Sequence, residues 1–315
     1  MDKLRRQINQ IDEKLMALID ERYQVTKAIG EFKRKNNIAV TNSKREEEVL
    51  SKADIYLYGD EIKDVYKMMF KKNKYYQGFE YGLIGKYLPY TLSPMIYELM
   101  GLSSYEVIET DDFKKTISKL NFKGLNITIP YKSEAYEFCD ELDDSAKLTK
   151  SVNTIYNNVG YNTDFLALVD LFTKLEIKDG IVTIIGIGAT SRATANALKK
   201  VSDHKINYLV RTKRDDNELL LSQYEDLLDS EYIINTTPYG TYPNVEDKPL
   251  FPLAKFKKLK MVIDVIYNPL NTPLILEAKK YNIKSINGLD LLVRQANLNF
   301  NLFTGCVNNN TSEVL

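Results

Sequence analysis

A pair of glycines follows an apolar run in the second half of the chain and could bind a phosphate group. Residues 181–185 are apolar or β-branched, as in a buried strand, and Gly186 and Gly188 permit a tight turn before an alanine-rich helical segment. Such a turn aims backbone N–H groups and the positive end of the helix dipole at one point, which suits a pyrophosphate. Ser191 stands where the dinucleotide fingerprint has a third small residue, so an ordinary strand–turn–helix connection stays open.

The following strand predicts which nucleotide this loop prefers. An acidic residue about 20 positions past the glycines would bind the ribose of NAD. Here the strand ends at Val210, and the residues after it are Arg211, Thr212, Lys213 and Arg214. A 2′-phosphate is bound by an arginine fork and a hydroxyl, so these residues favour NADP.

Several loops in the middle of the chain are unusually polar for strand ends. Thr91 and Ser93 place two hydroxyls beside Pro94 at the start of a helix, where they could hold a carboxylate or simply cap the helix. Later loops carry more polar groups, each of which could be turn chemistry: Asn126, Thr128, Lys132, Asn153, Thr154, Asn162, Thr163 and Asp164. Their accumulation in one half of the chain favours a binding site.

The first 77 residues carry a helical seam with one charge in it. Apolar residues recur alternately four and three positions apart, as in a heptad seam: Leu4, Ile8, Ile11, Leu15, Leu18, Val25, Ile29 and Phe32. Arg22 occupies a seam position, where a cation without an anionic partner is costly. Arg5 and Lys33 flank the seam, and Asn73 and Gln77 continue the inner face of a later helix. These groups are either solvated edge residues or the lining of a pocket for a small dianion, and Arg22 favours the pocket.

Composition argues against several classes of function. The 315 residues include 43 basic and 43 acidic ones, and zero net charge gives no support to a nucleic-acid or membrane-surface role. No apolar run approaches the roughly 18 residues of a membrane span. Cys139 and Cys306 are too few for a disulfide framework, which predicts a reducing cytoplasm. The only histidine, His204, lies in a polar link between a helix and a strand, so we expect no histidine triad and no metal.

Two kinds of element must position these residues. A helix over residues 2–35 would be about 50 Å long, more than a small domain covers, so we expect it to pack against a partner chain. Ser43 and Glu46 form a capping box that opens a second helix, which Gly59 ends, and a third helix is expected over residues 61–77.

Beyond this helical module, strands alternate with helices, which predicts an α/β architecture. Strands are expected at residues 80–84, 105–108, 124–128, 152–156, 181–185, 206–210, 232–235, 261–265 and 283–286. Those from residue 181 onward suit a parallel sheet with helices on both faces. The expected domains are residues 1–77, residues 79–178 completed by a returning last helix at 288–305, and a nucleotide-binding domain over residues 179–287.

The helical module resembles the all-helical chorismate mutases. The resemblance rests on the combined spacing of Leu4, Arg5, Ile8, Ile11, Asp12, Glu21, Arg22, Gly30, Lys33, Arg45, Glu46 and Gln77. It implies an intertwined homodimer that rearranges chorismate to prephenate, a pericyclic reaction that needs positioning and electrostatic stabilisation but no nucleophile.

The same resemblance implies roles for single residues. Arg22, with Arg5 from the partner chain, would hold the substrate carboxylates. Lys33 and Gln77 would bond the ether oxygen, Glu46 the hydroxyl, and Arg45 would add another cation to the pocket. Asn42 and Asn73 depart from the family pattern, where an aspartate and a small hydroxyl residue are common, but both can still form hydrogen bonds.

From about Tyr81 to Gly305 the chain resembles shikimate dehydrogenase, which implies an NADP domain of the Rossmann type. The resemblance rests on motifs in chain order: Thr91 to Pro94, Gly124 to Lys132, Val152 to Thr154, Gly160 to Asp164, Asn235 to Gly240, Asp264 to Pro273 and Gly288 to Ala296. It implies that the substrate carboxylate is bound by Thr91, Ser93 and Tyr267, and that its hydroxyls lie among Thr128, Asn153, Asp164 and Gln295.

Lys132 would pair with Asp164 at the reacting oxygen, where a developing alkoxide needs a cation and a proton. The expected NADP contacts are Gly186, Gly188, Ala189, Thr190, Arg211, Thr212, Asn235, Thr237 and Gly288. Thr91 replaces a commoner serine, and Ala189 and Thr190 replace a glycine and an alanine.

The sequence therefore predicts a cytoplasmic, bifunctional homodimer acting on chorismate and on shikimate or 3-dehydroshikimate. Two alternatives remain. The helical module could be a non-catalytic dimerisation or effector-sensing domain, and the dehydrogenase could be a quinate-type or NAD-using relative.

Overall fold

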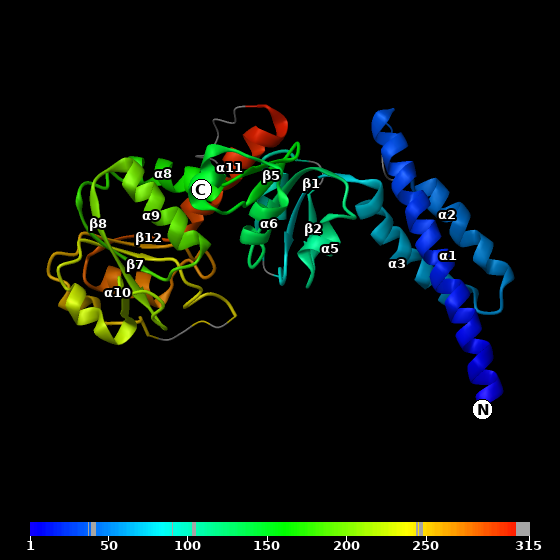
Figure 1. Cartoon of the computed structure of the whole chain (residues 1–315), viewed down its shortest axis with the longest axis horizontal. Helices are drawn as coiled ribbons and strands as arrows, with labels where there is room; N and C mark the ends of the chain where they lie inside the picture. The colour runs from blue at the N-terminus through cyan, green and yellow to red at the C-terminus, as the bar shows by residue number, and fades with distance from the viewer. Residues whose placement is uncertain are drawn as a thin grey trace.

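The computed structural model describes residues 1–36, 38, 42–89, 91–102, 105–243, 245 and 248–306. It contains three parts in chain order: a helical module, a mixed sheet and a parallel sheet (Figure 1). No helix in these ranges is both long enough and apolar enough to cross a bilayer.

The helical module is built on one long helix. α1 (Asp2–Lys35) packs against α3 (Gly59–Gln77), and α2 (Ser43–Ser51) with the 3₁₀ helix η1 (Lys52–Ile55) connects them. The N-terminal part of α1 projects beyond the other helices (Figure 1), and the seam residues on it are exposed. The expected first helix is confirmed at both ends.

Two details of the module differ from expectation. The cap of α2 is Asn42 rather than Ser43, because the Asn42 side chain accepts the N–H of Arg45 at 3.0 Å. The second helix stops at Ser51 and tightens into η1, and α3 begins at Gly59 instead of residue 61. At Gly59 a Cβ would lie 2.6 Å from the carbonyl oxygen of Ala53, so only glycine fits this close turn.

The first sheet has the order β2-β1-β3-β5-β6-β4 and is mixed. β2 (Glu106–Glu109), β1 (Phe79–Gly85) and β3 (Phe122–Ile127) run parallel, whereas β5 (Thr154–Tyr156) is antiparallel to β3 and to β6 (Val159–Tyr161). The short β4 (Glu141–Leu142) closes the far edge. β4 and β6 were not expected, since two or three residues carry no measurable periodicity.

Four short helices accompany this sheet: α4 (Ser93–Leu99), α5 (Phe113–Ile117), α6 (Lys132–Phe138) and α7 (Asp144–Thr149).

The second sheet is entirely parallel, with the order β12-β11-β10-β7-β8-β9, which confirms the expected arrangement. Its strands are β7 (Gly180–Ile185), β8 (His204–Val210), β9 (Glu218–Leu220), β10 (Tyr232–Asn235), β11 (Met261–Asp264) and β12 (Lys284–Ile286). The strand order reverses between β7 and β10, and in open α/β sheets ligands bind at the carboxyl ends of strands beside such a switch point.

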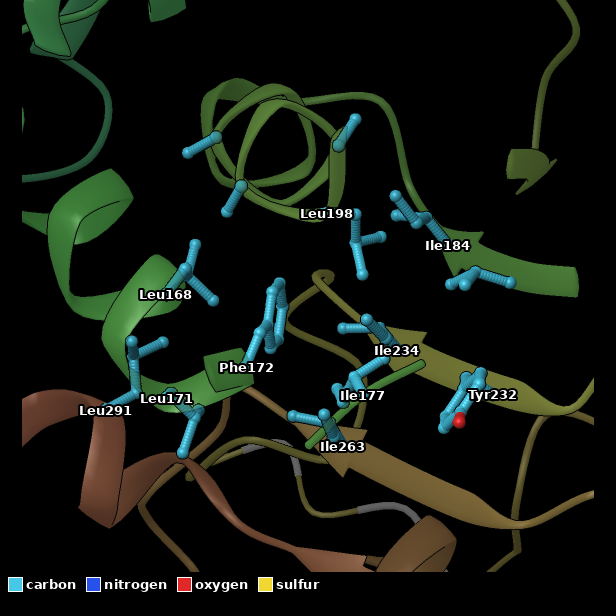
Figure 2. Packing of buried hydrophobic residues seen from close by; sticks show 14 of the residues in the cluster. Leu168, Leu171, Phe172, Ile177, Ile184, Leu198, Tyr232, Ile234, Ile263 and Leu291 are labelled. Carbon is cyan, nitrogen blue, oxygen red and sulfur yellow. The ribbon is translucent and has the colours of Figure 1, made fainter. Parts of the chain in front are cut away.

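Both faces of the parallel sheet are covered. α8 (Thr163–Lys174) and α9 (Ala189–Val201) pack Phe172 and Leu198 toward Ile184, Ile234 and Ile263 on one face (Figure 2). The other face is covered by α10 (Pro273–Lys280) and the 3₁₀ helices η2 (Leu221–Leu227) and η3 (Leu253–Lys255). His204 belongs to β8, not to a link as expected, and packs edge-on against Tyr232. Burial lowers the pKa of His204.

The last helix joins the two sheets. α11 (Gly288–Thr304) contributes Leu291 to the core beside the parallel sheet, and its far end reaches the first sheet. There Phe303 is fully buried and stacks on Tyr81 with ring centroids 4.7 Å apart, while the Tyr81 hydroxyl donates to the Phe303 carbonyl at 2.7 Å. The expected return of the last helix is confirmed.

Candidate active sites

A lysine and an aspartate meet where the two α/β parts adjoin. Lys132 is the first residue of α6, and Asp164 lies in the first turn of α8. Their Nζ and Oδ2 atoms are 2.6 Å apart, and the side chains are 15% and 19% exposed. The pair is largely desolvated yet reachable, so its charges act more strongly on a bound molecule than surface charges would.

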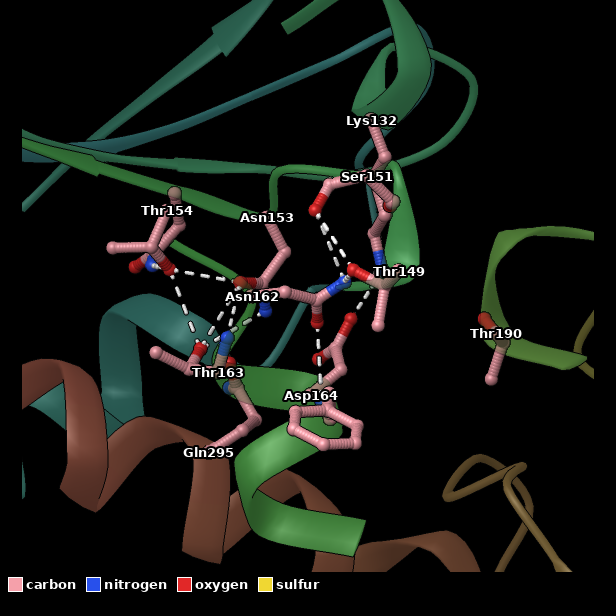
Figure 3. Close-up of polar contacts among 12 residues, drawn as sticks. Lys132, Thr149, Ser151, Asn153, Thr154, Asn162, Thr163, Asp164, Thr190 and Gln295 are labelled. Carbon is pink, nitrogen blue, oxygen red and sulfur yellow. Dashed lines mark hydrogen bonds and ion pairs between the residues drawn. The ribbon is translucent and has the colours of Figure 1, made fainter. Parts of the chain in front are cut away.

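The first turn of α8 is held by side chains from other segments (Figure 3). Asn162 caps the helix by accepting the Phe165 N–H at 3.0 Å, and its amide donates to Thr149 Oγ1 at 2.8 Å. Asn153 Oδ1 accepts the Thr163 N–H at 2.8 Å. These bonds orient the turn that carries Asp164.

A buried polar network continues beneath this turn. Asn126 Nδ2 donates to Thr154 Oγ1 at 3.0 Å, and Thr154 Oγ1 donates to Asn299 Oδ1 at 2.8 Å. Asn299 Nδ2 in turn donates to Gln295 Oε1 at 3.0 Å and to the Tyr97 hydroxyl at 3.1 Å. The network therefore joins β3, β5, α4 and α11 and orients the Gln295 amide.

Two of these network residues, Tyr97 and Asn299, were missed as functional candidates. Tyr97 donates to Asn126 at 2.9 Å, and burial raises the pKa of Tyr97, so its hydroxyl remains a neutral donor. Asn299 is fully buried on α11, one turn after Gln295. The sequence signal that could have identified Asn299 is its position four residues after Gln295, on the same face of one helix.

The hydroxyl candidates follow the strands of the first sheet. Thr91 Oγ1 lies 3.2 Å from Ser93 Oγ and accepts the Ser93 N–H at 3.3 Å, just at the start of α4. Thr128 follows β3, and its methyl group is so near Gly85 that a Cβ there would lie 2.6 Å away. In the described part of the chain no hydrogen bond joins Tyr267 to these residues, and burial raises the pKa of its phenol.

The glycine loop has the shape of a phosphate seat. Gly186 has φ +102°, a conformation open to glycine, and Gly188 precedes α9 without a side-chain cap. No atom lies within 4 Å of a Cβ placed on Gly188, so the N–H groups of Ala189 and Thr190 begin the helix beside open space. Ser191 is buried, and its hydroxyl donates to the Gly186 carbonyl at 2.7 Å, which closes the loop. The residues present therefore fit a dinucleotide phosphate.

Arg211 and Thr212 follow β8, the strand next to β7, and both are exposed. Arg211 forms no ion pair within the described residues, so its guanidinium can accept an anion. Their place one strand from the glycine loop fits a phosphate on the ribose of the nucleotide.

A buried carboxylate holds the residues that face the glycine loop through hydrogen bonds. Asp264, at the end of β11, accepts from Asn235 Nδ2 at 3.0 Å, from Thr272 Oγ1 at 2.6 Å and from the Ile266 N–H at 3.1 Å. Asn235 Oδ1 then accepts from Thr237 Oγ1 at 2.7 Å. Asp264 was not predicted as a site residue, although it lies in one of the motifs.

Gly288 is required by close packing. A Cβ on Gly288 would overlap the carbonyl oxygen of Val265, and the Gly288 N–H donates to the Ile266 carbonyl at 2.8 Å. This contact ties the start of α11 to the loop after β11.

The helical module contains a second group of candidates. Arg22 Nη1 donates to Asn73 Oδ1 at 3.1 Å, and its guanidinium lies 5.6 Å from the ring centre of Tyr66 and 5.7 Å from that of Phe70. Asn73 is buried, so its amide orients the guanidinium. No carboxylate within the described residues pairs with Arg22, which leaves a cation on a half-buried face.

Lys33 and Gln77 meet three helical turns further along. Lys33 Nζ donates to Gln77 Oε1 at 2.9 Å. Burial lowers the pKa of Lys33, and the nearby Glu46 carboxylate opposes that shift. The module thus brings Lys33, Gln77 and Glu46 near one another. Arg5 lies on the projecting part of α1, and Arg45 forms an exposed pair with Glu48.

Within the described ranges no three or more His, Cys, Asp or Glu side chains are grouped so that they could hold a metal.

Two parts of the chain match family models. A family model described as chorismate mutase type II matches residues 4–78, and one described as shikimate dehydrogenase substrate binding domain matches residues 83–155. A shikimate dehydrogenase (NADP(+)) of Sulfolobus acidocaldarius is 35% identical over 236 residues, which cover 69% of this chain and 86% of the relative.

Solved structures show the same likeness. A chorismate mutase/shikimate 5-dehydrogenase fusion protein from Clostridium acetobutylicum aligns with a TM-score of 0.68 at 26% identity, covering 75% of this chain and 96% of that one. A shikimate dehydrogenase in complex with NADP+ aligns with a TM-score of 0.62 at 33% identity, covering 73% and 91%.

The buried Asp264 predicts a pH-dependent stability. Burial raises the pKa of Asp264 from 3.8 to about 6, against the effect of its three hydrogen bonds. The folded state therefore holds this proton more tightly than the unfolded state. The stabilisation is fully present below pH 4 and is lost as the pH rises through 6.

We expect the free energy of urea unfolding, followed by circular dichroism, to fall between pH 4 and 7 by about 3 kcal/mol more in the wild type than in Asp264→Asn. Asp229→Asn, at an exposed ion pair with Lys258, should keep the wild-type profile. Parallel curves for the wild type and Asp264→Asn would contradict the assignment.

Proposed function

This chain belongs to the shikimate dehydrogenase family and carries a chorismate mutase type II domain before it, and from this premise we propose how its residues serve the two reactions. It is a bifunctional enzyme that rearranges chorismate to prephenate and reduces 3-dehydroshikimate reversibly to shikimate with NADPH. The Lys132–Asp164 pair is the observation that supports the second activity most directly.

Lys132 and Asp164 are the catalytic residues of the dehydrogenase. NADPH supplies a hydride to the ketone carbon when it is bound. The Lys132 ammonium stabilises the negative charge that develops on the ketone oxygen and donates the proton that completes the hydroxyl. Asp164 accepts a hydrogen bond from the ammonium at 2.6 Å and so holds it in place.

The substrate is held from two sides. Thr91, Ser93 and Tyr267 bind its carboxylate through neutral hydroxyls. Thr128, Asn153 and Gln295 bind its hydroxyl groups, and the network through Asn299 sets which way the Gln295 amide faces. The hydrogen bond from the Thr163 N–H to Asn153, in the turn that carries Asp164, supports placing the hydroxyl groups here.

The cofactor site uses the glycine loop and the strand beside it. Gly186, Gly188, Ala189 and Thr190 would receive the pyrophosphate at the start of α9. Arg211 and Thr212 would hold the 2′-phosphate. Asn235, Thr237 and Gly288 would form the side of the cofactor site that faces the glycine loop, where Asp264 holds Asn235 by a hydrogen bond.

The mutase site holds chorismate in a reactive conformation. Arg22, with Arg5 from a second copy of the chain, binds the carboxylates, and Arg45 adds another cation to the pocket. Lys33 and Gln77 bond the ether oxygen, and Glu46 bonds the hydroxyl. Because no bond to the protein forms, the whole rate enhancement comes from orientation and from cations near the breaking C–O bond.

A second copy of the chain completes this site. Leu4, Ile8, Ile11, Leu15 and Leu18 are 52–65% exposed on the projecting part of α1, and burying such a stripe against another copy is favourable. The same association would bring Arg5 into the partner's pocket. We place this homodimer in the cytoplasm, where the free Cys139 and Cys306 would stay reduced.

Lys132→Ala tests the dehydrogenase assignment. We expect the kcat for shikimate oxidation to fall about 10²-fold or more, with little change in the KM for NADP, since the lost interaction acts in the transition state. Lys114→Ala removes a lysine from an exposed ion pair with Glu137 and should leave both constants unchanged. Near-normal turnover of Lys132→Ala would remove this residue from the catalytic role.

Arg211→Ala tests the choice of nucleotide. The KM for NADP should rise far more than the KM for NAD, because only NADP carries the 2′-phosphate. Lys205→Ala changes an exposed cation at the opposite end of the same strand and should affect neither. An equal rise for both nucleotides would show that Arg211 does not read that phosphate.

Arg22→Leu separates a catalytic mutase from a dimerisation device. Leucine restores the apolar seam, so the dimer should persist in analytical ultracentrifugation, while mutase activity falls by about two orders of magnitude or more. Dehydrogenase activity should not change. Lys27→Leu also replaces a cation by leucine, at an exposed position of α1, and should keep mutase activity. Intact chorismate rearrangement in Arg22→Leu would contradict the assignment.

A further inference from the structure

The mutase residue Gln77 stands two positions before the core of the dehydrogenase. Gln77 is the last residue of α3, and β1 begins at Phe79. Only Gly78 separates them, and one residue spans no more than about 3.5 Å. This joint is therefore too short to let the end of α3 move far from the start of β1.

The first sheet of the dehydrogenase holds this joint on one side by a hydrogen bond and by packing. The Phe79 N–H donates to the Asn121 carbonyl at 3.0 Å, and the Phe79 ring stacks on Phe122 with centroids 6.2 Å apart. Phe79 is 9% exposed and belongs to the core of the first sheet. Gly78 has φ +114°, and a Cβ on it would lie 3.2 Å from the Asn121 carbonyl oxygen.

On the other side, the helical module packs against the last turn of α3. Gly30 on α1 lies so close that a Cβ there would overlap the backbone of Gln77. Tyr76 packs edge-on against Tyr23, with centroids 4.7 Å apart. Tyr76 and Lys72 also line a cavity of about 210 Å³ whose remaining walls are β2, the end of α5 and the residues that follow α5. The last turns of α3 are thus held between α1 and the first sheet.

We infer that the dehydrogenase is a structural part of the mutase site, in which Gly78 and Phe79 are positioning residues for Gln77. This rests on the proposed role of Gln77. The last turn of a helix frays unless its end is tied down, and here a sheet strand holds it. Since the mutase reaction depends on orientation, slack at the joint reduces turnover without removing any group that touches chorismate.

Inserting Gly-Ser between Gly78 and Phe79 of the full-length protein tests this inference. We expect the kcat for chorismate to fall about tenfold or more with a smaller change in KM, because the contact of Gln77 matters most in the transition state. Dehydrogenase constants should stay at wild-type values, which also shows that the sheet remains folded. Loss of both activities would overturn the inference, because the joint would then serve folding in general.

Gly78→Ala gives a second measure with a matched control. Alanine at φ +114° is strained and meets Asn121, so mutase kcat should fall in this variant as well. Gly101→Ala carries the same backbone strain at φ +94° in a place where no atom lies within 4 Å. Gly101→Ala should leave both activities unchanged, and equal mutase losses in the two variants would overturn the inference.

Gln77→Ala distinguishes this inference from the proposed function. If Gln77→Ala has wild-type mutase activity, the assigned role of Gln77 fails and the inference fails with it. If Gln77→Ala is impaired while the insertion variant is not, the inference alone is overturned. In the double variant the insertion should add little to the loss caused by Gln77→Ala, since both act through one side chain. A fully additive loss would contradict that coupling.

Discussion

The first turn of α8 is fixed by hydrogen bonds from its own cap and from one other segment, and the proposed dehydrogenase site depends on that arrangement. Asn162 and Asn153 hold this turn from its own cap and from the loop before β5. A buried polar group without a partner costs roughly 1–3 kcal/mol, so these amides tolerate few alternative positions. Asp164 inherits that restriction, and through a 2.6 Å contact so does Lys132.

The same reasoning explains why α11 belongs to both α/β parts. Its first turn packs against the loop after β11 at Gly288, and its last turn stacks Phe303 on Tyr81. Between these ends, Asn299 and Gln295 enter the network beneath the site. One helix therefore connects Gln295, a proposed substrate residue, with the sheet that would hold the cofactor.

The helical module follows a different physical logic. The dehydrogenase residues are oriented by buried contacts within one chain, whereas α1 exposes much of its apolar seam and carries Arg5 away from Arg22. Here orientation is shared between Asn73 on Arg22 and the joint that ends α3. The side chains proposed for the two reactions lie in different parts of the chain, and the joint at Gly78 connects those parts.

Local chemistry determined much of this protein. The heptad spacing of α1 and every strand of the parallel sheet except β9 could be predicted, because periodicity is read from neighbouring residues. The glycine turn and the charges after β8 pointed to Gly186 and Arg211 as candidates for the same reason. The pairing of Lys132 with Asp164 was expected from a resemblance, not from their separation in sequence.

Tertiary structure decided the rest. Asn42, and not Ser43, is the N-cap of α2. β4 and β6 are strands of only two or three residues, and they form because neighbouring strands supply their hydrogen bonds. Asp264 and Asn299 became organising residues only because their partners lie on other strands and helices. A buried polar side chain has a role only once its partners surround it, and those partners are far away in the sequence.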